Sequence, residues 1–176
     1  MCLNNSITLL GHSIFDYWLV DHINGEKVNN LGIAGINTRE YIDLILDRSL
    51  IKNIGDIAII MLGTNDMVLN DWNITFSAEW VREFIDKIRI IKSDVAIYFI
   101  AVPPVRGRVD RNNDIITQLN MVLRRVCVDK SIHWIELSSD FYDEYGNLPA
   151  SYTHDGLHFS PLAYSKLKEN IEAVLS

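Results

Sequence analysis

Short apolar runs recur along the chain, and most of them stop at a glycine, a proline or a polar loop. They predict strands over residues 6–10, 27–31, 56–62, 95–102 and 132–137. The runs at 56–62 and 95–102 are apolar at almost every position, which is typical of strands buried on both faces of a parallel sheet. The pattern therefore predicts a central parallel sheet of about five strands.

Between these runs, apolar residues follow the spacing of an amphipathic helix. This spacing predicts helices over residues 14–23, 38–46, 77–91, 112–128 and 161–175. Thr38 is the expected N-cap of the second helix, and Pro161 stands in the first turn of the last. Strands that alternate with helices predict an α/β fold with both sheet faces covered, and we expect a flavodoxin-like strand order by analogy.

The bulk composition limits the class of protein. The 176 residues predict one domain, 1–176, with 48% apolar and 22% charged residues, as in ordinary globular proteins. A net charge of -7 argues against a nucleic-acid partner, which needs a basic face. The two cysteines, Cys2 and Cys127, predict no disulfide framework. Without a signal-peptide pattern or an apolar stretch of about 18 residues, we expect a cytoplasmic protein with no membrane span.

Polar and glycine-rich segments follow the predicted strands. They are Gly11-His12-Ser13, the segment 32–37, the segment 63–66 and the arginine-rich segment 106–111. In parallel α/β sheets, ligands bind beyond the carboxyl ends of the strands. We therefore expect the functional site at this edge.

The segment Asp155-Gly156-Leu157-His158 places a carboxylate three residues before a histidine. One turn can bring the Asp155 carboxylate to one imidazole nitrogen and leave the other free as a base. Ser13, which follows a strand and opens a helix, is the candidate nucleophile. Each residue also has a purely structural interpretation, Ser13 as an N-cap and Asp155 as a loop cap.

Gly35 and Asn65 are candidates for stabilising an oxyanion. A glycine lets the backbone N–H approach a substrate closely, and an asparagine side chain donates an N–H without adding charge. The structural alternatives are a turn at Gly35 and an Asx-turn of Asn65 with Asp66. Phe15 stands two residues after Ser13, so the Gly-x-Ser-x-Gly elbow of α/β-hydrolases is not matched.

The histidines predict no metal site. His12, His154 and His158 match no standard zinc spacing together with Asp155, and no cysteine pair accompanies them. We therefore expect no metal.

Four segments together resemble the SGNH or GDSL hydrolase family. The resemblance implies a three-layer α/β/α fold and the hydrolysis of esters or thioesters without a cofactor. It implies Ser13, Asp155 and His158 as catalytic residues, with the Ser13 amide, the Gly35 amide and the Asn65 side chain as the oxyanion hole. The family usually has Asp where this chain has His12. This departure leaves two alternatives: His12 changes the local loop and its response to pH, or it only forms a hydrogen bond within the loop. The segments that carry the resemblance are Gly11-His12-Ser13-Ile14, Asn30-Leu31-Gly32-Ile33-Ala34-Gly35, Gly63-Thr64-Asn65-Asp66 and Asp155-Gly156-Leu157-His158.

The sequence says less about the substrate than about the catalytic residues. Three arginines between residues 106 and 111, Arg106 above all, favour a carboxylate- or phosphate-bearing substrate, although a solvated loop would have the same sequence. Trp72 is a candidate for stacking on a sugar ring, with simple packing as the alternative, and His12 is a third candidate contact. These features favour a small-molecule substrate, an O-acetyl ester of an acidic carbohydrate such as a sialic acid.

Other functions stay open. A lysophospholipase or thioesterase would use the same residues. A non-catalytic ligand-binding domain or an interaction domain once fused to a larger enzyme would keep the fold without the chemistry. The sequence does not indicate the oligomeric state.

Overall fold

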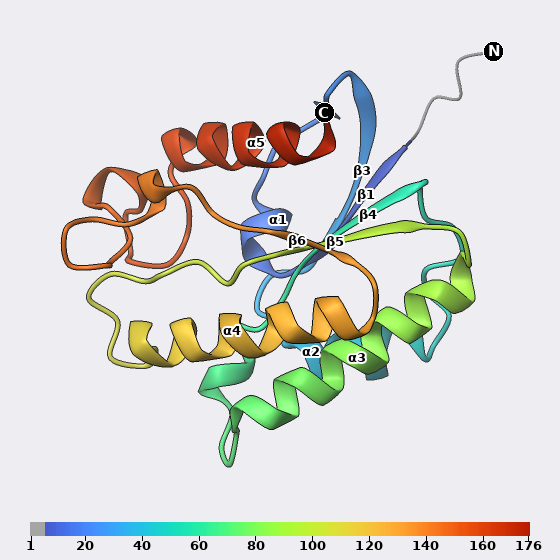
Figure 1. Cartoon of the computed structure of the whole chain (residues 1–176), viewed down its shortest axis with the longest axis horizontal. Helices are drawn as coiled ribbons and strands as arrows, with labels where there is room; N and C mark the ends of the chain where they lie inside the picture. Colours follow the sequence, from blue (N-terminus) through green and yellow to red (C-terminus); the bar gives the residue numbers. More distant parts are fainter. Residues whose placement is uncertain (1–5) are drawn as a thin grey trace.

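The computed structural model describes residues 6–176 and is built on one sheet (Figure 1). Its strands are β1 (Ile7–Gly11), β2 (His22–Ile23), β3 (Glu26–Gly32), β4 (Ile57–Met61), β5 (Ala96–Ile100) and β6 (His133–Ile135). The order is β2-β3-β1-β4-β5-β6, with β2 antiparallel to β3 and every other neighbouring pair parallel. The five parallel strands have the expected flavodoxin-like order, and β2 adds a two-residue edge strand that the apolar pattern did not predict.

Helices cover both faces of this sheet, so the expected three-layer α/β/α arrangement is confirmed (Figure 1). One face carries α1 and α5, and the other carries α2, α3 and α4. The helices are α1 (Ser13–Asp16), α2 (Thr38–Tyr41), α3 (Ile74–Ile91), α4 (Asn113–Asp129) and α5 (Pro161–Leu175), and a π-helical turn, Ile42–Leu46, continues α2. Short 3-10 turns occupy Asp66–Val68, Ser139–Phe141 and Ala150–Tyr152.

The side chains of the central strands explain why helices pack on both faces of the sheet. Leu9 of β1, Ile59 of β4 and Phe99 of β5 are fully buried, because alternate side chains of each strand enter opposite cores. Leu9 lies opposite Ile59 in the β1–β4 register. A strand that is buried on both faces must be apolar throughout, which is the pattern that predicted β4 and β5.

The first predicted helix, over 14–23, is wrong beyond Asp16. The side-chain amide of Asn30, on β3, donates to the carbonyl oxygens of Phe15 (2.6 Å) and Trp18 (3.2 Å), which removes acceptors that a longer helix would use. The chain then turns into β2 and leaves Leu19 99% exposed. A side chain from another strand therefore ends this helix.

The N-cap of helix α2 lies one residue earlier in the sequence than predicted. Asn37, and not Thr38, is the N-cap: its side chain accepts from the Glu40 N–H at 2.8 Å, and Glu40 returns a bond to the Asn37 N–H at 3.2 Å. Thr38 instead donates its hydroxyl to the buried Asp66 at 2.9 Å.

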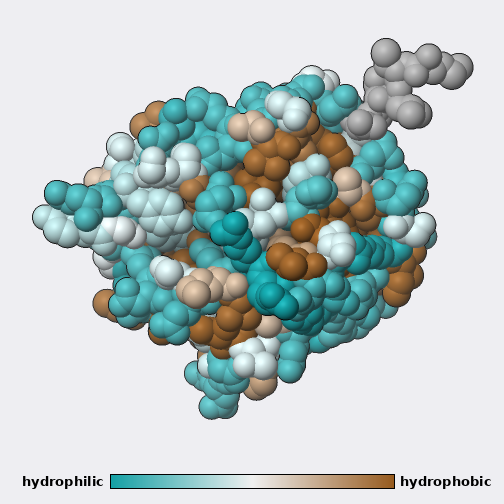
Figure 2. All heavy atoms as spheres, in the orientation of Figure 1, coloured by the Kyte–Doolittle hydropathy of each residue, from teal (hydrophilic) through white to brown (hydrophobic). Residues whose placement is uncertain are grey.

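The surface in view is mostly hydrophilic, with hydrophobic side chains gathered in separate patches (Figure 2). Within residues 6–176, no helix is both long enough and apolar enough to cross a membrane. Cys127 is buried and forms no disulfide in this part of the chain, and Cys2 lies outside the described residues.

Candidate active site

Ser13 is the first residue of α1, directly beyond the carboxyl end of β1. Two glycines allow this close passage of the chain. A Cβ at Gly11 would stand 2.4 Å from the Met61 carbonyl oxygen, and one at Gly32 would stand 2.4 Å from the Asp16 nitrogen. Gly32 therefore lets β3 and α1 approach each other backbone to backbone, and Gly11 lets β1 lie close to β4, just before the helix starts.

Ser13, His158 and Asp155 form a continuous hydrogen-bonded relay. The Ser13 Oγ lies 3.0 Å from His158 Nε2, and His158 Nδ1 lies 2.5 Å from Asp155 Oδ2. An imidazole held in this way by a carboxylate presents its other nitrogen to accept a proton from the serine hydroxyl. The structure brings together the three residues that the sequence predicted as catalytic.

The segment that carries Asp155 and His158 is fixed from both sides. Asp155 Oδ1 accepts the backbone N–H groups of Leu157 (2.9 Å) and His158 (2.8 Å). Gly156 has a φ of +85°, and its carbonyl accepts the Arg106 N–H at 2.8 Å. Partial burial raises the pKa of Asp155, but its hydrogen bonds with His158 and Leu157 outweigh burial and hold that pKa well below its usual range.

Three N–H groups that could stabilise an oxyanion remain available. Within residues 6–176, the backbone N–H groups of Ser13 and Gly35 donate to no protein acceptor. Asn65 Nδ2 donates one N–H to the Ile36 carbonyl oxygen at 2.9 Å, which leaves its second N–H free. This bond also ties the Gly35 loop, after β3, to the Asn65 loop, after β4.

Arg111 is a residue of this site that sequence reasoning did not single out. Its Nη2 donates to Asn65 Oδ1 at 2.9 Å, and its side chain is 5% exposed. The two residues are 46 positions apart, so no local motif connects them. Their only sequence signal is that both follow neighbouring strands of the predicted sheet.

His12 lies inside the molecule and not on the substrate-facing surface. It is 1% exposed, and its Nδ1 accepts the Ile14 N–H at 3.4 Å as the N-cap of α1. Its Nε2 is buried and has no hydrogen-bond partner in the described part of the chain. Burial above all, together with the charges of His158 and Arg111, lowers the pKa of His12 to about 3, so the ring is neutral near pH 7.

The two other predicted substrate contacts lie outside the relay. Arg106 Nη1 bonds Asp143 at 2.7 Å and the Leu148 carbonyl oxygen at 3.3 Å. Trp72 donates its indole N–H to Ser77 at 2.9 Å and lines a separate depression of about 610 Å³ whose lining residues include no member of the relay. Trp72 is therefore placed away from Ser13.

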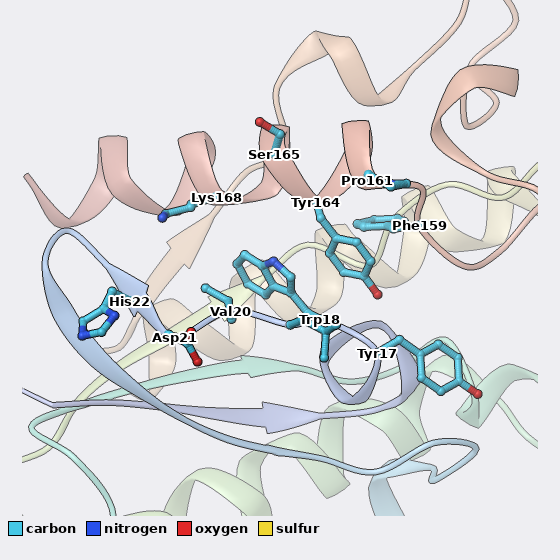
Figure 3. A pocket seen from close by; sticks show the side chains of 11 residues that line it. Tyr17, Trp18, Val20, Asp21, His22, Phe159, Pro161, Tyr164, Ser165 and Lys168 are labelled. Carbon is cyan, nitrogen blue, oxygen red and sulfur yellow. The ribbon is translucent and has the colours of Figure 1, made fainter.

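An aromatic groove runs along α5 (Figure 3). Its volume is about 740 Å³, and Tyr17, Trp18, Phe159 and Tyr164 supply its aromatic wall. The Tyr17 ring packs against the His158 ring with centroids 5.2 Å apart. Sequence reasoning placed Tyr17 in a longer helix and did not identify it as a neighbour of the base.

The described residues offer no metal site: within 6–176, no three His, Cys, Asp or Glu side chains gather closely enough to hold an ion. The polar groups at the carboxyl edge of the sheet instead bring together a serine hydroxyl, an imidazole, a carboxylate and a set of N–H donors. This arrangement can carry out acyl transfer through a serine ester.

One curated relative is similar to almost the whole of this chain. N-acylneuraminate cytidylyltransferase of Escherichia coli O18:K1:H7 (strain RS218 / NMEC) is 44% identical over 171 residues, which are 97% of this chain and 40% of that protein. This chain therefore spans 40% of the length of that curated relative.

Solved structures share the fold. A Streptococcus pneumonia protein described as a platelet activating factor has a TM-score of 0.87 at 23% identity, over 98% of this chain and 84% of its own. A GDSL-like lipase from Bacteroides thetaiotaomicron VPI-5482 has a TM-score of 0.74 at 17% identity, over 98% of this chain and 88% of its own. The acetyl xylan esterase AlAXEase has a TM-score of 0.74 at 13% identity, over 97% of this chain and 100% of its own.

The sequence profile of the GDSL-like lipase/acylhydrolase family matches residues 8–166, which include the whole relay. The chain therefore belongs to the GDSL-like lipase/acylhydrolase family.

Proposed function

We propose that this protein hydrolyses short acyl esters of an acidic sugar, with Ser13 as the nucleophile. The observation that carries the proposal is the continuous relay from Ser13 Oγ through His158 to Asp155, with spacings of 3.0 Å and 2.5 Å. A serine that only capped a helix would have no reason to meet an imidazole oriented by a carboxylate.

The acylation step follows from these positions. His158 Nε2 takes the proton of the Ser13 hydroxyl while Ser13 Oγ attacks the acyl carbonyl carbon. Asp155 keeps the other imidazole N–H in place and stabilises the imidazolium that forms. His158 then returns the proton to the leaving sugar oxygen as the C–O bond breaks, and the acyl group stays on Ser13.

The negative charge that develops on the carbonyl oxygen is taken up by N–H donors. These are the backbone N–H groups of Ser13 and Gly35 and the free N–H of Asn65. Loss of one such donor typically costs about 3–4 kcal/mol of transition-state stabilisation. A water molecule then attacks the acyl-enzyme with His158 again as the base, which releases the carboxylic acid and restores Ser13.

The substrate class rests on the relative and on the rim of the site. That relative is named for N-acylneuraminate, a carboxylate-bearing sugar whose hydroxyls can carry acyl esters. Arg106 and Arg108 supply cationic groups on the loop that packs against Gly156. The groove of about 740 Å³ is bordered by Tyr17, whose exposed ring lies beside His158 and offers a surface on which a sugar ring can stack.

The test is the release of acid from defined esters by the wild type and by Ser13→Ala. We expect the wild type to release acetate from an O-acetylated N-acylneuraminate with a higher kcat/KM than from a neutral acetylated sugar. We expect Ser13→Ala to have no measurable turnover of either ester or of p-nitrophenyl acetate, because it lacks the nucleophile.

Circular dichroism and thermal melting of Ser13→Ala show whether its fold is retained. Turnover by a folded Ser13→Ala protein would refute the nucleophile. Among acetyl, butyryl and octanoyl p-nitrophenyl esters, we expect the acetyl ester to be preferred. A preference for the octanoyl ester would refute the short-acyl assignment and favour a lysophospholipase or thioesterase.

A further inference from the structure

The direction of the Asn65 side-chain amide decides whether this residue can stabilise an oxyanion. A primary amide is nearly symmetric in shape, but only its nitrogen carries N–H groups, and its oxygen would repel an oxyanion. Rotation of the Asn65 side chain by half a turn would exchange a stabilising donor for a destabilising acceptor. The site therefore needs groups that fix the direction of this amide.

Two neighbours with opposite hydrogen-bonding demands fix it. The Ile36 carbonyl oxygen only accepts, and it takes an N–H of Asn65 Nδ2 at 2.9 Å. The Arg111 guanidinium only donates, and its Nη2 reaches Asn65 Oδ1 at 2.9 Å. Each bond would be lost in the reversed orientation, so the structure over-determines the direction of the amide.

Arg111 is itself held rigidly. Its Nε donates to the carbonyl oxygen of Thr64 at 3.1 Å and to the Thr64 hydroxyl at 3.2 Å, and its Nη1 reaches Asp110 at 2.5 Å. It immediately precedes Asn112, the N-cap of α4, so the helix start also fixes its backbone. The planar guanidinium thus bonds the backbone and the side chain of the Asn65 loop together.

We propose that Arg111 is a positioning residue of the oxyanion hole, which holds the Asn65 amide with its free N–H toward the reacting carbonyl oxygen. This inference rests on the proposed role of Asn65 as an oxyanion donor. A donor bonded to Oδ1 also polarises the amide and strengthens the N–H on its nitrogen. Arg111 therefore acts on the transition state through Asn65 and does not touch the substrate.

The test is a double-mutant cycle on p-nitrophenyl acetate, a neutral ester that does not depend on the identity of the natural sugar. The variants are Arg111→Lys, Asn65→Ala and both together. Lysine keeps the charge, but its single ammonium cannot replace the fork that reaches Thr64, Asn65 and Asp110 at once. Arg125→Lys, an exposed position on α4, is the matched control.

We expect Asn65→Ala to lower kcat by about 10²–10³-fold, as for the loss of one oxyanion donor. We expect Arg111→Lys to lower kcat by roughly 10–10²-fold with KM nearly unchanged, since an interaction formed only in the transition state is weakened. In the Asn65→Ala background, Arg111→Lys should change kcat by less than about twofold, because its target is absent. Arg125→Lys should keep the wild-type kcat.

Asp110→Asn supplies a second variant, because this half-exposed residue anchors Arg111 from the surface and its replacement leaves the buried arginine in place. We expect it to lower kcat less than Arg111→Lys and to lose its effect in the Asn65→Ala background. The inference is overturned if neither variant lowers kcat, or if the loss persists at full size without Asn65. A wild-type kcat in Asn65→Ala would instead refute the oxyanion role of Asn65 in the proposed function.

Discussion

The buried imidazole of His12 makes the stability of this protein sensitive to mild acid. Its pKa falls to about 3 in the folded chain, against about 6.5 in an unfolded one, because burial disfavours the charged ring. Below about pH 6.5, His12 therefore binds a proton in the unfolded chain but stays neutral in the folded chain. Stability is present above that pH and is lost as the pH falls toward about 3.

We expect the free energy of unfolding to drop by about 2 kcal/mol through His12 alone between pH 7.5 and pH 5.0. His12→Asn keeps an N-cap acceptor for the Ile14 N–H and removes the titrating ring. Urea denaturation of both proteins at these two pH values measures the difference between their pH slopes. Taking that difference cancels the contribution of Asp66, whose pKa is raised by burial. Equal slopes would mean that His12 is accessible to protons in the folded state.

The individual site residues differ in how far sequence could predict them. Asp155 and His158 are three residues apart, so one local motif determines their contact. The pair Asn65–Arg111 is formed by loops that follow different strands, and its bond depends on how α4 begins. Trp72 and Tyr17 show the same limit, because only the packed structure decides which aromatic ring lies beside His158.

At the scale of elements, the segment that carries the acid and the base depends on the glycine inside it. Gly156 has a φ of +85°, and a Cβ there would stand 1.9 Å from the Arg106 carbonyl oxygen. A side chain at this position must push the segment away from the loop that follows β5. Because His158 lies in the same segment, its distance from Ser13 would change with it.

We expect Gly156→Ala to lower kcat by about 10²-fold, as for a displacement of about 1 Å in a catalytic group. Gly25→Ala is the matched control: Gly25 has a φ of +77°, but nothing lies within 4 Å of its added Cβ, and it belongs to the turn between β2 and β3. It should be less stable by about 1–2 kcal/mol with kcat unchanged. Steady-state kinetics and thermal melting measure kcat and stability in both variants. An unchanged kcat in Gly156→Ala would disprove the dependence of the segment on this glycine.

The elements themselves were predictable where the cause is local. The strands at 56–62 and 95–102 are buried on both faces, and their unbroken apolar composition reports that burial directly. The helix predicted over 14–23 was wrong because Asn30, from a neighbouring strand, takes its carbonyl groups. Periodicity along the chain contains no information about a hydrogen bond that arrives from another element.

At the scale of the whole molecule, an acidic protein is expected to bind an acidic ester poorly unless cations line the site. The net charge is -7, yet three arginines occur between residues 106 and 111 at the carboxyl edge of the sheet. Asp143 engages Nη1 of Arg106, whose side chain is 43% exposed. The remaining guanidinium N–H groups can meet a carboxylate.

We expect Arg106→Ala to raise KM for an O-acetylated acidic sugar by about tenfold, the loss of one charge-assisted contact. KM for p-nitrophenyl acetate should not change, because this ester has no carboxylate. The same two substrates measured with Arg125→Ala control for the general loss of a positive charge. If KM for the acidic ester is unchanged in Arg106→Ala, Arg106 is not part of the substrate site.

The hydrogen bond between Ser13 and His158 joins residues that are 145 positions apart in the sequence. Ser13 is synthesised well before His158, so a nascent chain lacks this hydrogen bond until α5 and the segment before it dock on the sheet. Contacts of such long sequence range form only after the intervening chain has ordered. The ester hydrolysis that we propose for Ser13 would therefore report that this long-range contact has formed, and its reappearance after dilution from denaturant would time the docking of this segment.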